Sequence, residues 1–278
     1  MGDRRLLIPR DRELRPDPAP IDELRTRAIH APDVVRYQQS FWIDSRSQDA
    51  RGALREVDLF LRIGVMRPEG ADGEARQAGV VYKLLGSSDR RKQEGVFARR
   101  LPSGEEEWQV RLCLQASSPG VVPFFAWYDD GRGGVFYDDN ARQLHVVLWK
   151  EGFEVVRHEF EATNVELTDA GVRGTLSVLL ADLEYHKEVG LVWTTDGWKT
   201  HQEFGTGPAA VNMWHWVRDA FEGFQQWQIV LDVPGSFDAF EYAIVYRHGA
   251  VQGAVRQEFW ADNGHRNFVV RRGQGSRP

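Results

Sequence analysis

Few side chains in this chain are arranged for catalysis. The best candidates for an acid and a base that cleave a glycosidic bond are two adjacent pairs, Asp129 with Asp130 and Asp138 with Asp139. Both pairs lie in turn sequences, and neighbouring residues of a strand point to opposite faces of the sheet. The two carboxylates of a pair are therefore poorly placed to act together on one glycosidic bond. No Gly-rich phosphate loop leads from a strand into a helix, so the sequence favours a protein that is not an enzyme.

Metal, nucleic-acid and membrane sites are not indicated. The eight His residues show no HxxxH spacing, and the single cysteine, Cys113, excludes an internal disulfide. Cys113 lies in the apolar run VRLCL, which predicts a small core residue. The net charge of −6 gives no favourable counterion release from a phosphate backbone, so we expect no nucleic-acid partner, no metal and no cofactor. Without a signal peptide or a segment of roughly 18 apolar residues, a cytoplasmic location is expected.

The chain is rich in aromatic residues, which make up 12% of it and include ten Trp. Part of this supply fills cores, and a surplus is what a stacking or interface surface requires. Trp198 follows an Asp-Gly turn, where a bulky ring is more often at the surface than a core plug. Trp260 follows Phe259, and alternation along a strand turns one of the two outward. In NMWHW (212–216) one Trp is expected to pack, and the other can extend such a surface.

An internal repeat divides the chain. FYDDNARQLHVV (136–147) returns as FWADNGHRNFVV (259–270), with five of twelve positions identical and no gap. In each half the motif follows EWQVRL or QWQIVL, a Gly/Pro turn, and then VPFFAWY or FEYAIVY. Because order, residue type and approximate spacing all agree, the repeat indicates a duplication.

Short runs bounded by Gly, Pro and Asp fill both halves, and many are β-branched, aromatic or alternating. This texture is typical of strands, at about seven per 120 residues. The sequence predicts an all-β fold of two tandem immunoglobulin-like β-sandwiches, at 34–150 and 151–273. Residues 1–33 are expected to be an N-terminal arm, in which IDELRTRAIH could form a short helix. The connection near 150–152 is so short that the two domains are expected to pack against each other.

Three separated motifs follow one another in the second half: LEYHKEVGLVWTTDGWKT (183–200), FEYAIVY (240–246) and FWADNGHRNFVV (259–270). They resemble an aromatic-x-Lys segment with its Thr/Ser-Asp-x-Trp turn, the penultimate strand and the closing motif of carbohydrate-binding module family 21. Members of that family are starch- and glycogen-binding β-sandwiches. The resemblance covers about residues 153–271 and implies binding of α-1,4-glucan. Ala261 stands where the family has an Asp.

The resemblance implies two stacking rings, at Trp198 and Trp260. A flat aromatic ring covers the C–H face of a glucose without stranding a hydroxyl, and the rim hydroxyls need fixed polar partners. The resemblance places such polar and further contacts at Tyr185, Lys187, Asp262, Asn263 and Asn267. The polar residues of the closing motif also make a good hairpin turn that needs no ligand, and those of the first motif could be ordinary loop residues.

The first half matches less well. It keeps the closing motif, with Tyr137, Asp139 and Asn140 as a possible second site. The segment KLLGSSDRRKQ has no aromatic residue at the position of Trp198, and Leu144 replaces Asn267. The first half is therefore either a degenerate scaffold or a weaker site.

The expected function is non-catalytic binding of an α-glucan polysaccharide or malto-oligosaccharide. Such a protein could hold a partner on the polymer, either a glycogen-metabolism enzyme or a phosphatase. A phosphatase-docking motif of the basic-x-Val-x-Phe kind is not present, because GVFARR has its basic residues on the wrong side. The alternative is a protein-interaction scaffold whose exposed rings bind another protein.

Overall fold

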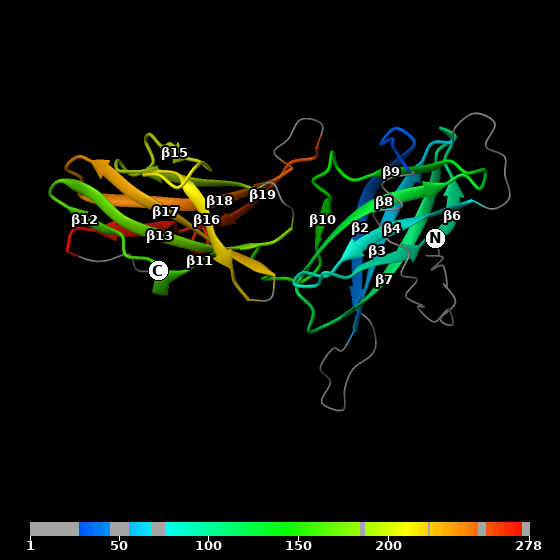
Figure 1. Ribbon diagram of the computed structural model, residues 1–278, viewed down its shortest axis with the longest axis horizontal. Coiled ribbons are helices and arrows are strands. Elements are labelled where there is room, and N and C mark those ends of the chain that lie inside the picture. The colour runs from blue at the N-terminus through cyan, green and yellow to red at the C-terminus, as the bar shows by residue number, and fades with distance from the viewer. Residues whose placement is uncertain are drawn as a thin grey trace, which may run out of the picture.

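The structure is a computed structural model that describes residues 28–44, 56–67, 76–183, 187–221, 223–249 and 254–273. Within these ranges the regular structure is almost entirely β-strand, with one short 3-10 helix, η1 (Phe160–Ala162). The all-β fold predicted from the sequence is confirmed. No helix in the described ranges is long and apolar enough to cross a membrane. Figure 1 shows the strands gathered in two bodies that follow each other along the long axis.

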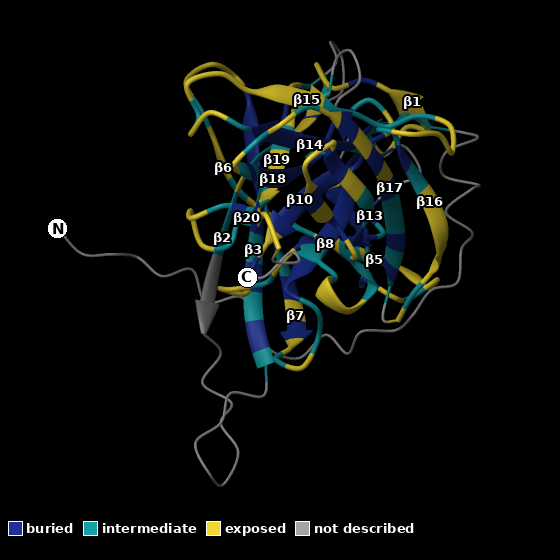
Figure 2. Cartoon of the chain, turned by 90° about the vertical axis from the view of Figure 1, so that its left-hand side faces the viewer, coloured by how far each residue is buried: buried dark blue, intermediate teal, exposed yellow. Residues whose placement is uncertain are grey.

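Alternating hydrophobicity explains why these segments form strands. In β3 (Glu56–Val65), Val57, Leu59, Leu61 and Ile63 are buried, and the residues between them are partly exposed. This period of two matches a strand with one face on a core, and β-branched side chains fit such a pleated surface. Figure 2 shows the same alternation as bands of buried and exposed residues along the strands.

The N-terminal sheet pair consists of β1 (Ile29–His30), β2 (Val35–Asp44), β3, β4 (Gln77–Lys83), β5 (Arg90–Glu94), β6 (Val96–Arg100), β7 (Glu106–Gln115), β8 (Val121–Asp129), β9 (Val135–Asp138) and β10 (His145–Leu148). One sheet has the order β1-β9-β8-β4-β5, with β10 also on β8, and the other has the order β2-β3-β7-β6. Both sheets contribute to one hydrophobic cluster, in which Leu61 of β3 lies with Phe124 of β8. Two sheets around a shared core form a β-sandwich.

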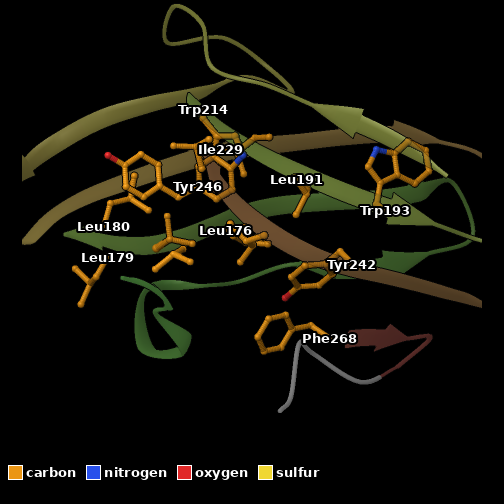
Figure 3. Close-up of a cluster of buried hydrophobic side chains, with 14 of the residues drawn as sticks. Leu176, Leu179, Leu180, Leu191, Trp193, Trp214, Ile229, Tyr242, Tyr246 and Phe268 are labelled. Atoms are coloured by element: carbon orange, nitrogen blue, oxygen red, sulfur yellow. The ribbon is translucent and has the colours of Figure 1, made fainter. Parts of the chain in front are cut away.

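The C-terminal sheet pair consists of β11 (Val156–His158), β12 (Glu166–Thr168), β13 (Gly171–Ala181), β14 (Glu188–Thr194), β15 (Gln202–Phe204), β16 (Trp214–Asp219), β17 (Phe224–Pro234), β18 (Ala239–His248), β19 (Gln257–Ala261) and β20 (Phe268–Arg271). One sheet has the order β11-β13-β17-β16, with β12 also on β13, and the other has the order β15-β14-β18-β19, with β20 also on β18. Figure 3 shows the core between them, where Leu176 and Ile229 of one sheet approach Tyr242 and Tyr246 of the other.

The two sheet pairs repeat one topology. Strands β2-β3-β7-β6 correspond to β11-β13-β17-β16, and β9-β8-β4-β5 correspond to β19-β18-β14-β15. The register also agrees, because Tyr128 lies opposite Phe136 as Tyr246 lies opposite Phe259. The edge strands β6 and β16 even carry a bulge at the same register position. This is the arrangement that the internal sequence repeat predicts.

The chain passes from one sheet pair to the other between β10 and β11, and the two pairs share a buried junction. Asn140 Nδ2 donates to the carbonyl oxygen of Val255, and the Val255 N–H donates to Asn140 Oδ1. His248 Nε2 lies 3.0 Å from the carbonyl oxygen of Leu144. Apolar residues of the N-terminal pair also join the C-terminal core cluster, namely Leu85, Val121 and Val146.

Two local expectations were wrong. Ile29 and His30, at the end of the segment expected to form a helix, form β1 and pair in parallel with β9. The earlier part of that segment lies outside the described residues. Cys113 is exposed and not a core residue, because alternation along β7 turns Leu112 and Leu114 inward and Cys113 outward.

His158 makes the C-terminal pair sensitive to acid. Its ring contacts Phe160 and Phe268, at centroid distances of 4.1 and 4.6 Å, and its Nε2 lies 2.9 Å from the Tyr242 hydroxyl. Burial lowers the pKa of His158 from 6.5 to about 4. The unfolded chain therefore takes up the proton first as the pH falls. The free energy of unfolding is expected to decrease between about pH 6.5 and pH 4, by up to about 3 kcal/mol.

Replacing this ring tests that expectation. In His158→Gln the free energy of unfolding should fall less steeply between about pH 7 and pH 4 than in the unchanged protein, as measured by urea titration at several pH values. His248, whose pKa is also lowered by burial, still contributes part of the slope. An equally steep slope in the variant contradicts the assignment to His158.

Candidate functional site

The outer face of one C-terminal sheet carries two indoles. Alternate residues of β18 point into the core, so Glu241, Ala243 and Val245 lie on the outer face. Trp260 on β19 lies opposite Val245, and 46% of its surface is exposed. Trp198 is half-buried, and its Nε1 donates a hydrogen bond to Glu241 Oε2 at 2.8 Å. We call this outer surface of β14, β18 and β19 the indole face.

A tight loop between β14 and β15 positions Trp198. Gly197 and Trp198 both have left-handed backbone angles, with φ of 69° and 65°. A Trp in this region is uncommon and persists only where its surroundings hold it. The Trp198 N–H donates to Thr194 Oγ1 at 3.3 Å, and the indole N–H is held by Glu241. Backbone and ring are therefore both anchored to the sheet.

Asp196 closes this loop on itself. Its carboxylate accepts hydrogen bonds from the Thr200 N–H at 3.0 and 3.1 Å, and from the Thr200 and Thr194 hydroxyls at 2.7 Å. The Thr200 backbone and hydroxyl bonds, with that from Thr194, lower the pKa of Asp196 from 3.8 to about 2. The carboxylate therefore remains ionised, and the loop closed, throughout the neutral and mildly acidic range.

Removal of this carboxylate is expected to loosen the loop and leave the sheet intact. In Asp196→Ala, amide hydrogen exchange in residues 194–200 should accelerate by at least about tenfold, because the loop loses its side-chain acceptors. In the unchanged protein this protection should persist below pH 3.8 and disappear only as the pH falls toward about 2. Exchange in β13 serves as the internal control, and unchanged exchange in the loop contradicts the role of Asp196.

The floor of the indole face consists of small side chains that have little exposed surface. Val192, Ala243 and Val245 lie on the outer side of the sheet and are only 9%, 3% and 0% exposed. Glu241 bonds to the Trp198 indole, and Val245 lies opposite Trp260. Ala243 lies midway between these two residues on β18. These two are four residues apart, or about 13 Å along the strand. The two indoles are thus attached next to strand positions that are about 13 Å apart along β18.

A polar turn borders the same face. β19 and β20 pair one after the other with β18, so the turn between them projects beside Ala243. Asn263, Gly264, His265 and Asn267 all have left-handed φ, between 53° and 66°. Gly and Asn adopt this region most readily, which explains their presence here.

The side chains of this turn divide into two groups. Asp262 accepts from the His265 N–H at 3.0 Å and contacts His265 Nδ1 at 2.9 Å, and Asn263 Nδ2 donates to the Asn267 carbonyl oxygen at 3.2 Å. Asp262 and Asn263 therefore brace the turn, as the hairpin interpretation of the sequence had it. The Asn267 backbone N–H donates to the Asp262 carbonyl oxygen, whereas its side-chain amide makes no hydrogen bond within the described ranges.

One predicted contact, Lys187, is not part of the indole face. Lys187 is 5% exposed, and its Nζ lies 2.8 Å from Asp182 Oδ1. It precedes β14, whereas Trp198 follows β14, so the length of that strand, about 20 Å, separates them. The structure does not bring Lys187 to the two rings. Tyr185 lies outside the described residues.

The corresponding face of the N-terminal pair is filled by its own side chains. In register, Phe125 takes the place of Ala243, and Tyr137 takes that of Trp260. Phe125 and Trp127 are 3% and 1% exposed and form a separate buried cluster. The first half thus has large buried rings where the second half has the small side chains of Ala243 and Val245.

Two residues of the possible second site, Asp139 and Asn140, are buried and bonded within the protein. Asp139 and Asn140 are 1% and 5% exposed. Asp139 accepts from the Arg142 N–H at 2.9 Å, and Asn140 bonds to the Leu144 carbonyl oxygen and to Val255 across the junction. Tyr137 packs on Phe125. The closing turn of the first half therefore holds the two sheet pairs together.

The sequence did not identify Glu241 as a site residue, and the two Trp residues of NMWHW do not lie on the indole face. Glu241 accepts the hydrogen bond that orients Trp198. In the sequence, only the alternation of FEYAIVY indicates that Glu241 points away from the core. Trp214 is buried in the core, whereas Trp216 is 52% exposed on the edge strand β16. β16 belongs to the other sheet, so Trp216 does not extend the indole face.

The indole face offers a flat contact surface with hydrogen-bonding groups at its rim. Glu203, Glu188 and Glu258 surround Arg247 at the end of the face nearest the junction. Within the described ranges, no group of His, Cys, Asp and Glu side chains could hold a metal ion. Such a surface can stack on and hydrogen-bond a ligand with flat apolar faces and a polar rim. No protein-family model and no curated protein matches this chain.

Proposed function

We propose that the C-terminal sheet pair binds α-1,4-linked glucan, such as glycogen, starch or a malto-oligosaccharide, on the indole face and without catalysis. The observation that carries this proposal is that Trp198 and Trp260 lie on one outer face, next to strand positions on either side of the small residue Ala243. Each indole offers an apolar surface to the C–H face of a glucose ring, and Asn267 offers an amide to its hydroxyls.

The separation of the rings favours a polymer over a monosaccharide. The strand positions next to the two rings, Glu241 and Val245, are about 13 Å apart, which exceeds the length of one sugar unit, so we expect one chain to contact both rings. Binding at two linked points gives an affinity above that of either contact alone. The resemblance to carbohydrate-binding module family 21 supports the α-glucan as the ligand, because Trp198 and Trp260 are the positions it assigns to stacking rings.

The proposal also assigns a role to the N-terminal sheet pair and to the protein as a whole. The two sheet pairs are tandem immunoglobulin-like sandwiches, of which the first is a degenerate copy that serves as a scaffold. Its filled outer face at Phe125 and Trp127 supports that role. The protein acts in the cytoplasm and holds a partner, such as an enzyme of glycogen metabolism, on the polymer.

Calorimetric titration of the full chain with maltoheptaose and glycogen tests the proposal. We expect a Kd on the order of 0.1 mM for maltoheptaose, or about 5.5 kcal/mol of binding free energy. Cellohexaose, a β-linked glucan, should bind at least about tenfold more weakly, because its straight chain does not follow the two rings. The affinity should not change between low and high salt, since neutral sugars release no counterions. No heat at millimolar maltoheptaose would overturn the proposal.

The alternative function is a protein-interaction scaffold. An exposed apolar strip on and beside the edge strand β16 favours it, since Trp216 and Phe221 are 52% and 53% exposed. A chain that binds no glucan supports this alternative. Release of reducing sugar from glycogen would instead indicate an enzyme.

A further inference from the structure

A pocket opens at the end of the C-terminal sheet pair farthest from the junction. Its volume is about 380 Å³, within the range of small-ligand sites. It lies between the two sheets, with Trp193 and Phe204 on one side and Val233 on the other. The remaining lining residues are Thr195, Gln202, Asn212, Asp232, Pro234 and Phe237. We call this space the distal pocket.

Aromatic rings form the walls of the distal pocket and are held in place. Trp193 contacts Phe204 and Phe240, at centroid distances of 5.3 and 5.4 Å. Figure 3 shows Trp193 at one end of the core, well away from Tyr246. Gly235 has φ of 148°, and a Cβ there would lie 2.2 Å from the Phe237 ring. Only glycine therefore lets Phe237 lie where it lines the pocket.

Polar groups lie between these rings. Asn212 Oδ1 accepts from the Asp232 N–H at 3.1 Å, and its Nδ2 donates to the Asp232 carbonyl oxygen at 3.2 Å, so its position is fixed. Trp193 Nε1 is buried and has no acceptor among the described residues. A buried N–H without a partner marks a place where a ligand or a water completes the hydrogen bonding. Aromatic walls with the amides of Asn212 and Gln202 and the hydroxyl of Thr195 fit a neutral polyhydroxy ring.

The distal pocket lies next to the indole face. Thr195, which lines the pocket, directly follows β14 and begins the loop that carries Trp198. Trp193, two residues before Thr195 on β14, points into the core. Trp198 lies on the outer face of the sheet, where Glu241 holds its indole. One loop therefore separates the two surfaces, and a chain that lies on the indole face can turn its end into the pocket.

We propose that the distal pocket holds the terminal glucose unit of an α-glucan chain whose next units lie on the indole face. The inference rests on the proposed glucan binding and adds recognition of chain ends. Trp193 and Val233, which line the pocket, belong to the core cluster, so a chain that enters from outside meets the core, and we expect its end rather than its middle to occupy the pocket. The protein then prefers polymers that present many ends at their surface, as a highly branched glucan does.

The test compares a glucan with ends and one without. Full-length protein is titrated with maltoheptaose and with β-cyclodextrin, its seven-glucose cyclic counterpart. Phe237→Ala removes a pocket wall and should weaken maltoheptaose binding by about fivefold or more, while leaving β-cyclodextrin binding unchanged. Gln202→Trp fills the pocket from an exposed position and should do the same without touching a buried group. Phe221→Ala, an exposed Phe at the other end of the sheet pair, is the matched control.

The outcomes separate the two proposals. Loss confined to maltoheptaose in both pocket variants supports chain-end binding. An equal effect on both sugars, or no effect on either, overturns chain-end binding and leaves the indole face as the glucan site. If the unchanged protein binds neither sugar, glucan binding itself is overturned, and the distal pocket with it.

Discussion

Replacement of Trp198 or Trp260 by alanine is expected to weaken maltoheptaose binding by about thirtyfold each, or about 2 kcal/mol, as for a central aromatic contact in an interface. Trp260 has an exposed ring with no anchoring hydrogen bond in the described ranges, so its variant loses stacking area alone. Trp198→Ala also frees Glu241 from the indole N–H. Isothermal titration of both variants and the double variant measures the effect. The double variant should show no measurable binding.

Trp216→Ala is the matched control for this experiment. Trp216 is 52% exposed and Trp260 46%, but Trp216 lies on the edge strand of the other sheet. Its replacement should leave the affinity for maltoheptaose unchanged. If instead Trp216→Ala abolishes binding and Trp260→Ala does not, the glucan lies along β16, and the indole face has no part in it. Unfolding curves of all variants confirm that only the surface has changed.

The exposed position of Trp260 could be predicted because it depends on local geometry alone. Phe259 and Trp260 are neighbours on a strand, the strand period is two, and only one of them can reach the core. The repeat identifies Phe259 as the inward member, since Phe136 stands in its place. The strand-rich fold follows from the same alternation, summed over many short runs bounded by turn residues.

Residues whose role depends on distant partners could not be predicted in this way. Asn140 and Asn263 are the same residue in the same left-handed turn, and each bonds to a carbonyl oxygen four residues later. Asn140 also bonds across the junction to Val255, 115 positions away, which no local pattern reveals. Lys187 appears in a motif with Trp198, yet a whole strand separates them in space.

The outer faces of the two halves differ in side-chain volume, which the sequence repeat does not reveal. The sequence repeat aligns backbone positions, and the strand register of the two halves agrees at these positions. At the floor, however, Ala243 corresponds to Phe125, and Val245 corresponds to Trp127. These rings are buried in the N-terminal half, and Lys92 Nζ lies 4.0 Å from the Trp127 ring. The two halves therefore differ here in side-chain volume, with buried rings in the first half and small side chains in the second.

Glu106→Gln is expected to destabilise the N-terminal sheet pair by about 3 kcal/mol, as for a broken buried ion pair. Glu106 is 1% exposed and accepts hydrogen bonds from three guanidinium groups, those of Arg67, Arg76 and Arg100. Burial alone raises the pKa of Glu106, but the hydrogen bonds from the arginines outweigh it and lower the pKa below 4.5. The neutral amide leaves three cations close together without their counter-charge.

Urea unfolding measured by fluorescence and by circular dichroism checks this expectation, with Asp232→Asn as the control. Asp232 pairs with Arg173 in an exposed position, at 3.1 Å, so its loss should cost less than about 1 kcal/mol. Because the Glu106 pKa is depressed, its contribution is present at neutral pH and is lost as the pH falls through the folded-state value. A difference between the two variants that does not change as the pH is lowered from neutral contradicts the charge mechanism.

The same variant separates the roles of the two sheet pairs. In the repeat, Gln225 of β17 takes the register position of Glu106 of β7, so the C-terminal pair does not depend on such a cluster. Glu106→Gln should therefore weaken the scaffold and leave the affinity of the folded protein for maltoheptaose unchanged. If the two halves unfold in separate steps, the loss should appear only in the N-terminal step. A parallel loss of sugar affinity would mean that the N-terminal pair acts on the indole face through the junction at Asn140.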